Sequence, residues 1–226
     1  MITWALLFNL TFDMQNPSTE LIYVADPMCS WCYGFGPQLA TVQEATGLPV
    51  RLVMGGLYVG DRAQPATPGL RQYLEETWDR VESRTGQPFR FDHAEPLVQG
   101  DWMYDTAPSA QAVIHVRDKT PDRALAYLGA VQRAFYFDGR DVTKWEVLES
   151  IGQELGLGSI ASIESLLNPG SLEKDMAESL ALGANGYPKV ILGTSYPDGR
   201  VDHVPVATGF TRASDVQRKI QVLLTP

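Results

Sequence analysis

Apolar runs at strand spacing and helical spacing alternate over the first quarter of the chain. Residues 21–25 form an apolar run of strand-forming side chains, which ends at Pro27 because proline cannot continue a strand ladder. Residues 38–45 repeat apolar positions at helical spacing and stop at Gly47. Residues 50–57 are again typical of a strand. The pattern therefore predicts a strand–helix–strand unit, which builds pairs of parallel strands.

The middle of the chain has helical spacing almost throughout. Apolar residues recur every three or four positions between about residues 68 and 183, whereas residues 86–96 are typical of a loop. Thr106 and Ser171 each precede one of these stripes and are predicted to cap a helix. The spacing predicts helices over residues 70–81, 107–116, 121–135, 142–155, 159–167 and 172–182.

The last part of the chain returns to strand signals. Residues 187–192 and 201–206 are predicted strands, and the turn residues 197–199 between them indicate a hairpin. Residues 214–224 have the apolar spacing of a closing helix. The element order is therefore βαβ, then a helical block, then ββα.

The helical block is too long to be a loop and is predicted to form a lobe of its own. We therefore expect an α/β sheet domain made of two separate segments, residues 14–60 and residues 171–226. An all-helical domain, residues 61–170, is expected to interrupt it.

Composition narrows the class of protein. The 226 residues are 44% apolar and 20% charged, which is ordinary for a globular protein and unlike a disordered chain. The formal net charge of −9 argues against nucleic acid or an anionic membrane as the main partner, because both repel acidic proteins. Two cysteines are too few for a disulfide scaffold, a four-thiolate zinc site or an iron–sulfur cluster.

The N-terminal segment is apolar but lacks the marks of an export signal. Residues 1–10 are mostly apolar, yet no lysine or arginine occurs before Arg51, and the run is too short to span a bilayer. A cytoplasmic location is therefore expected. An alternative for this segment is that Met14 is the natural start and that residues 1–13 are an upstream extension.

The two cysteines, Cys29 and Cys32, stand in the motif Cys-Ser-Trp-Cys between a predicted strand and a predicted helix. Backbone N–H groups at a helix start have no intrahelical partner, and the helix dipole is positive there, so both effects favour a thiolate at Cys29. The spacing places both sulfurs within one helical turn, with Cys32 more shielded. Cys29 is therefore the predicted attacking thiolate and Cys32 the predicted resolving thiol. The carboxylate of Asp26 and the net negative charge oppose thiolate formation.

Several neighbours of the cysteines are candidate binding residues. The backbone N–H groups of Ser30 and Trp31 and the Ser30 hydroxyl are placed to donate hydrogen bonds to the Cys29 sulfur. We expect Trp31 to be partly exposed and to contact a bound polypeptide. A further hypothesis is that Trp102-Met103-Tyr104 closes over the groove beside the cysteines.

Two other interpretations of the cysteine pair stay open. A Cys-x-x-Cys motif is half of a zinc site, but the histidines that would complete it (His93, His115 and His203) show no paired ligand spacing. We expect these histidines to be structural or superficial, and we expect no metal. Two buried, inert cysteines are the second interpretation. The position between a strand and a helix favours redox chemistry over both.

Three features together resemble the DsbA-like family of the thioredoxin superfamily, in particular its FrnE-like cytoplasmic branch. They are the Cys-Ser-Trp-Cys motif after a strand, the helical block after the second strand, and Gly186-Tyr187-Pro188 at the start of a late strand. The resemblance covers nearly the whole chain from about Leu21. Residues 26–35 are its most specific part.

The resemblance implies a thioredoxin-like fold interrupted by an inserted all-helical subdomain. It implies that Cys29 is the nucleophile, Cys32 the resolving cysteine and Pro188 a cis-proline opposite the pair. A cis bond there would free the backbone of Tyr187 to pair with an extended substrate. The implied enzyme is a thiol–disulfide oxidoreductase that needs no cofactor, because the cysteine pair carries two electrons. Its expected partners are polypeptides or low-molecular-weight thiols such as glutathione.

The chain departs from the family pattern at a position that affects proton transfer. Many relatives carry an acidic residue six positions before the first cysteine, which helps to move protons at the resolving thiol, and this chain has Tyr23 there. Asp26 is nearer to the cysteines but in a different register. Proton transfer is therefore expected to use water or another carboxylate.

Two alternative functions remain at this point. Glutathione-dependent transferases and isomerases of the kappa type share the inserted helical lobe, although they typically carry serine at the reactive position. A non-catalytic module that binds polypeptides between the lobes is the second alternative. The presence of two cysteines favours redox chemistry.

Overall fold

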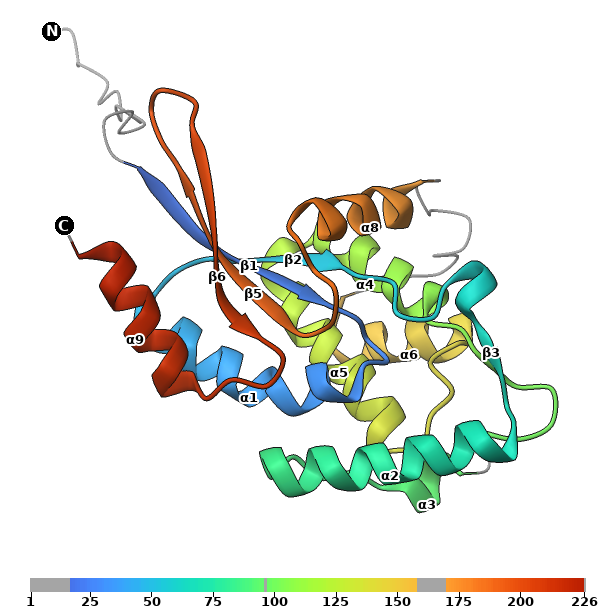
Figure 1. Ribbon diagram of the computed structural model, residues 1–226. Helices are drawn as coiled ribbons and strands as arrows, with labels where there is room; N and C mark the ends of the chain where they lie inside the picture. Colours follow the sequence, from blue (N-terminus) through green and yellow to red (C-terminus); the bar gives the residue numbers. More distant parts are fainter. Residues whose placement is uncertain (1–16, 96, 158–169, 226) are drawn as a thin grey trace, which may run out of the picture.

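A mixed four-stranded sheet brings the early and late parts of the sequence together (Figure 1). The computed structural model describes residues 17–95, 97–157 and 170–225. In the strand order β2-β1-β5-β6, β2 is parallel to β1 and the other neighbours are antiparallel. The predicted βαβ unit and late hairpin are both confirmed. The strands are β1 (Ser18–Ala25), β2 (Val50–Met54), β5 (Lys189–Ser195) and β6 (Val201–Thr208).

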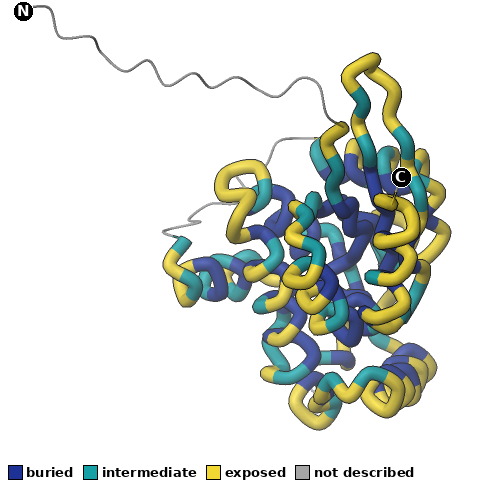
Figure 2. The backbone as a smooth tube through the Cα atoms, turned by 90° about the vertical axis from the view of Figure 1, so that its left-hand side faces the viewer, coloured by how far each residue is buried: buried dark blue, intermediate teal, exposed yellow. Residues whose placement is uncertain are grey.

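Both faces of β1 are buried. Side chains alternate across a strand, so Leu21 and Tyr23 pack towards α1 (Ser30–Thr46) while Ile22 and Val24 form a second cluster on the opposite face. This explains why the segment has a continuous apolar run instead of an alternating pattern. By contrast, the turn that joins β5 to β6 projects from the body and is largely exposed (Figure 2).

Three helices complete the sheet domain. Helix α1 follows β1 and packs against the closing helix α9 (Ala213–Leu224). Helix α8 (Ser171–Ala181) lies beside β2 on the other side of the molecule (Figure 1). Among the described helices, none is both long and apolar enough to cross a membrane.

The helical lobe occupies the chain between β2 and α8. Its core is aromatic: the Trp78 ring lies 4.9–5.6 Å, centroid to centroid, from the rings of Phe89, Phe91, Phe135 and Tyr136. Buried residues of the lobe and of the sheet belong to one continuous cluster. The helices are α2 (Pro68–Thr85), α3 (Phe91–Ala94), α4 (Ala107–Lys119), α5 (Ala124–Tyr136) and α6 (Trp145–Glu154).

Short elements accompany these helices and were not predicted. A two-stranded ribbon pairs β3 (Gln64–Pro65) with β4 (Met103–Tyr104), and two single 3₁₀ turns occur at η1 (Gly60–Arg62) and η2 (Pro121–Arg123). Helix α3 also falls inside the segment predicted as a loop. Elements of two to four residues are too short to have a periodic pattern, so no sequence signal predicts them.

Some predicted boundaries are wrong for physical reasons. Helix α1 begins at Ser30 and contains Pro37, so it starts about two turns before the apolar stripe at residues 38–45. Strand β2 ends at Met54 and not at residue 57, because Gly56 adopts a positive φ of 66° and the chain turns away from the sheet. Gly170, with a φ of 84°, holds the N-cap position of α8 in place of Ser171.

The predicted helix over residues 159–167 and the apolar segment over residues 1–10 both lie outside the described residues, as does the proposed start at Met14. The domain boundaries at residues 60–61 and 170–171 stay a prediction.

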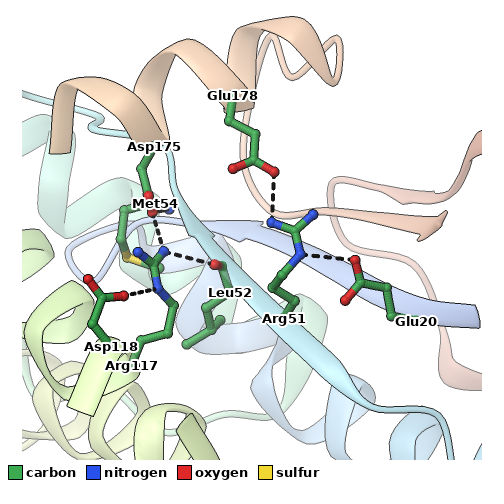
Figure 3. A network of polar contacts seen from close by, with 8 residues as sticks. All are labelled: Glu20, Arg51, Leu52, Met54, Arg117, Asp118, Asp175 and Glu178. Atoms are coloured by element: carbon green, nitrogen blue, oxygen red, sulfur yellow. Dashed lines mark hydrogen bonds and ion pairs between the residues drawn. The ribbon is translucent and has the colours of Figure 1, made fainter. Parts of the chain in front are cut away.

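The outer edge of β2 is covered by an ion pair from two helices (Figure 3). The Arg117 guanidinium on α4 donates to the Leu52 carbonyl oxygen at 3.1 Å and to Asp175 Oδ2 at 2.6 Å. Asp175 on α8 accepts a second hydrogen bond, at 2.8 Å, from the backbone N–H of Met54. Edge-strand groups that would otherwise be open to pairing are thereby satisfied.

Candidate active site

Both cysteines lie at the start of α1. Cys29 is the N-cap residue, and its carbonyl oxygen accepts from the backbone N–H groups of Cys32 and Tyr33 at 2.9 and 3.1 Å. The two thiols are free. Cys29 is 6% exposed whereas Cys32 has no exposed surface, so Cys32 is the more shielded of the two, as the spacing predicts.

A segment from the far end of the chain faces Cys29. The Tyr187–Pro188 peptide bond is cis, in agreement with what the resemblance implies. The Cys29 thiol donates to the Tyr187 carbonyl oxygen, with 3.7 Å between the sulfur and the oxygen. The Tyr187 hydroxyl in turn donates to the carbonyl oxygen of Gly55 at 2.7 Å, which fixes the ring over the end of β2.

A small cavity of about 140 Å³ opens beside Cys29. The predicted binding residues Ser30, Trp31 and Tyr187 all line it, and Trp31 is half-buried, as expected. The helical lobe supplies the facing wall from α2 and β4. The remaining residues that line the cavity are Met28, Leu57, Tyr58, Tyr73, Leu74, Thr77 and Tyr104.

The hypothesis for Trp102-Met103-Tyr104 holds for the last of the three residues. Tyr104 lines the cavity, and its hydroxyl donates to the carbonyl oxygen of Met28, directly before Cys29. Trp102 stacks behind Tyr104 with its ring centroid 5.6 Å away. Met103 does not line the cavity and is 41% exposed.

Asp26 is a buried carboxylate between the sheet and the lobe, with no exposed surface. Its Oδ1 accepts from the backbone N–H of Met28 at 2.9 Å, and its Oδ2 accepts from Leu57 N–H at 2.7 Å. The Thr106 hydroxyl also donates to Oδ2, at 2.9 Å. Burial raises the pKa of Asp26 to about 6, even though all three hydrogen bonds favour the charged form.

Cys32 lies in an environment that disfavours its thiolate. Burial raises the pKa of the Cys32 thiol, and the Cys29 thiol and the Asp26 charge raise it further. Tyr23, which stands where relatives carry an acid, donates its hydroxyl to the Cys32 carbonyl oxygen at 3.4 Å. Burial also raises the pKa of Tyr23, so this side chain is uncharged at neutral pH.

Sequence reasoning gave Asp26 a minor place and missed the role of Thr106. The sequence indicates Asp26 as a charge that opposes the thiolate and as a carboxylate in a different register from the family's acid, and it indicates Thr106 as a helix cap. Thr106 does hold the N-cap position of α4, but its side chain makes no cap hydrogen bond and turns to Asp26 instead. No local signal identifies this contact, because 80 residues separate the two side chains.

The histidines lie away from the cavity. None of His93, His115 and His203 is among its lining residues. His93 is exposed beside Arg90, His115 lies in α4 and His203 in β6. Within residues 17–95, 97–157 and 170–225, no group of three His, Cys, Asp or Glu side chains is arranged to hold a metal ion.

Comparison with known proteins identifies the family. No family model matches the chain, and a search of curated proteins finds no match. Among solved structures, the cytosolic disulfide reductase DsbM from Pseudomonas aeruginosa is 31% identical, with a TM-score of 0.73 over 91% of this chain and 98% of DsbM. The chain belongs to the DsbA-like family of thiol–disulfide oxidoreductases. The predicted family and the predicted thioredoxin-like fold with its helical insertion are thereby confirmed.

Two further structures place this DsbA-like chain among its neighbours. A proposed protein disulfide isomerase from Nitrosomonas europaea is 26% identical, with a TM-score of 0.77 over 92% of this chain and 98% of that protein. A second DsbM structure was determined with GSH. A 2-hydroxychromene-2-carboxylate isomerase shares the fold alone, at 12% identity over 90% of this chain and 93% of that protein, with a TM-score of 0.53.

Proposed function

We propose that this DsbA-like protein exchanges disulfides through Cys29 and Cys32. The observation that carries the proposal is the Cys29 thiol, which opens on a cavity and contacts the Tyr187 carbonyl oxygen next to the cis-bonded Pro188. A thiol in this position meets an extended substrate whose backbone lies along Tyr187.

The exchange balances in two steps. The Cys29 thiolate attacks one sulfur of a substrate disulfide, so that a mixed disulfide forms and the other substrate sulfur leaves as a thiolate that takes up a proton. Cys32 then loses its proton and attacks the Cys29 sulfur, which releases the second substrate thiol. The substrate gains two electrons and the cysteine pair loses them, so no cofactor takes part. The same steps in reverse oxidise a dithiol.

The assignment of the two roles follows from exposure. Cys29 is the more exposed of the two cysteines, at 6%, and it lies at the helix start on the wall of the cavity. Cys32 is fully buried and its environment raises its thiol pKa, so it does not compete for the incoming disulfide. It attacks only an adjacent sulfur, which is the task of a resolving thiol.

Substrate contacts are assigned to the walls of the cavity. The backbone of Tyr187 would pair with the substrate strand, and Ser30 and Trp31 would contact the residues beside the reacting sulfur. We propose polypeptides or low-molecular-weight thiols as partners. The structure of DsbM with GSH favours glutathione among the latter.

A cytoplasmic location and a reducing direction belong to the same proposal. The neighbour DsbM is a cytosolic disulfide reductase, and the cytosol keeps thiols reduced. In that compartment the Cys29–Cys32 pair would be returned to the dithiol by the glutathione pool and would act on substrate disulfides.

The deciding experiment compares insulin disulfide reduction, with glutathione as reductant, for the wild type, Cys29→Ser and Cys32→Ser. We expect activity in the wild type, none in Cys29→Ser, and a trapped mixed disulfide on Cys29 in Cys32→Ser. An inactive wild type that still binds unfolded polypeptide would replace the proposal with a binding module. Glutathione conjugation that survives Cys32→Ser would replace it with a transferase.

A further inference from the structure

Thr106 belongs to the helical lobe, yet its side chain is part of the surroundings of the cysteine pair. It is fully buried at the first turn of α4, where Asp105 takes over the capping role by accepting from the Ala107 N–H at 2.9 Å. The Thr106 hydroxyl oxygen accepts from the backbone N–H of Tyr58 at 3.3 Å. With that hydrogen bond on its oxygen, the hydroxyl hydrogen points to Asp26 Oδ2.

The three hydrogen bonds on the Asp26 carboxylate come from unlike sources. Two donors are backbone N–H groups, those of Met28 and Leu57, which lie in the loops that follow β1 and β2. The third donor, Thr106, is a side chain from another lobe. Each donor favours the charged carboxylate, and burial opposes all of them, so the balance between the charged and the neutral form depends on every donor.

Asp26 is connected to the resolving cysteine. It lies three residues before Cys29 and its carbonyl oxygen accepts from the Cys29 N–H at 3.2 Å. Its charge raises the pKa of the Cys32 thiol, while a hydrogen bond from its backbone lowers it. A change in the charge of Asp26 therefore changes the fraction of Cys32 present as thiolate.

We propose that Thr106 is a positioning residue through which the helical lobe sets the charge of Asp26 and thereby the reactivity of Cys32. The proposal rests on the role of Cys32 as resolving thiol. Loss of the Thr106 hydroxyl would leave the carboxylate with one donor fewer, so Asp26 would hold its proton to higher pH. Neutral Asp26 no longer repels a thiolate on Cys32, and the pH at which Cys32 becomes reactive shifts with it.

Other groups around Asp26 do not reproduce this effect between pH 5 and pH 8. Arg62 is the cation that acts on Asp26, and its charge lowers the pKa of that carboxyl. Burial raises the pKa of each neighbouring phenol, so these stay neutral. The titratable and charged groups that face Asp26 are Cys29, Cys32, Tyr58, Arg62, Tyr104, Tyr136 and Tyr187.

The test follows two quantities in the full-length wild type, Thr106→Val, Thr106→Ser and Asp26→Asn. The first is the midpoint of Asp26 protonation, from the ¹³C shift of its carboxyl carbon against pH. The second is the rate, as a function of pH, at which a thiol is released from a mixed disulfide with Cys29. This rate measures the attack by Cys32.

In Thr106→Val we expect the Asp26 midpoint to rise by about 1 pH unit, which is the effect of one hydrogen bond to a charged group. The inflection that Asp26 gives to the release profile should move with it. Thr106→Ser keeps the hydroxyl and should match the wild type, and Asp26→Asn should lack the inflection. Urea unfolding of each variant identifies any that does not fold, and Thr106→Ala then replaces Thr106→Val.

Unchanged midpoints in Thr106→Val and Thr106→Ala would overturn the proposal. So would a midpoint that moves while the release profile stays where it is. These outcomes leave the exchange function intact, because the wild type still releases the thiol. A wild type that does not release the thiol through Cys32 would refute the exchange function itself, and this inference with it.

Discussion

The Cys29 sulfur lies 3.7 Å from the carbonyl oxygen of Tyr187, although 158 residues separate the two in the sequence. A glycine makes this contact possible. A Cβ on Gly55 would lie 2.1 Å from the Tyr187 ring, so any larger residue there would displace the ring and the carbonyl that faces the thiol. The end of β2 thus holds the substrate-facing segment against the cysteines.

Gly55→Ala should therefore impair exchange. We expect the rate of insulin reduction to fall by about tenfold or more, because small displacements of reacting groups are costly. Gly36→Ala is the matched control, since a Cβ on Gly36 in α1 would meet nothing within 4 Å. Equal rates for Gly55→Ala and the wild type would show that the position of Tyr187 is not needed.

Trp31→Ala should separate binding from chemistry. Trp31 is half-buried on the cavity wall. Removal of its ring takes apolar contact area from a bound polypeptide. The KM for insulin should therefore rise several-fold while kcat changes little. A fall in kcat at constant KM would assign Trp31 to the chemical step instead.

The buried Asp26 carboxyl should make the protein less stable as pH rises. Its pKa is about 6 in the folded state, above that of an exposed aspartate, so the folded state binds the proton more tightly. The contribution of this carboxyl to the free energy of unfolding is greatest below its pKa in the unfolded chain. It is lost as the pH rises through 6. Between pH 5 and pH 7.5 the loss is on the order of 1 kcal/mol. Urea unfolding should show this slope in the wild type and not in Asp26→Asn, and equal slopes would contradict it.

The Arg117–Asp175 ion pair at the edge of β2 should contribute more to stability than the exposed ion pairs of Arg51. Arg117→Leu leaves Asp175, whose side chain is 5% exposed, without its cation and should cost about 3 kcal/mol of unfolding free energy. Arg51→Leu removes a cation from the pairs with Glu20 and Glu178, all more than a third exposed, and should cost less than about 1 kcal/mol. Urea unfolding of the two variants measures both. Similar costs would mean that the buried pair contributes no more than the exposed ones.

The sequence by itself determined the features that depend on short-range spacing. Two intervening residues place Cys29 and Cys32 in one helical turn, and the short apolar runs and the stripes at period 3.6 predicted the main strands, the helices and their order. The family pattern added the cis bond before Pro188. The cysteine spacing and the periodic runs rest on local backbone geometry, which neighbouring residues dictate.

Only the tertiary structure decided what surrounds the sulfurs. The sequence indicates Thr106 as a helix cap, but its hydroxyl donates to the buried carboxylate of Asp26, 80 residues away. The Asp105 carboxylate accepts the hydrogen bond from the Ala107 N–H at the helix start instead. Asp26 follows a strand like any turn aspartate, and its raised pKa exists because the lobe and the sheet exclude water from it. Desolvation and long-range hydrogen bonds are properties of the packed chain, so no local pattern of residues could predict them.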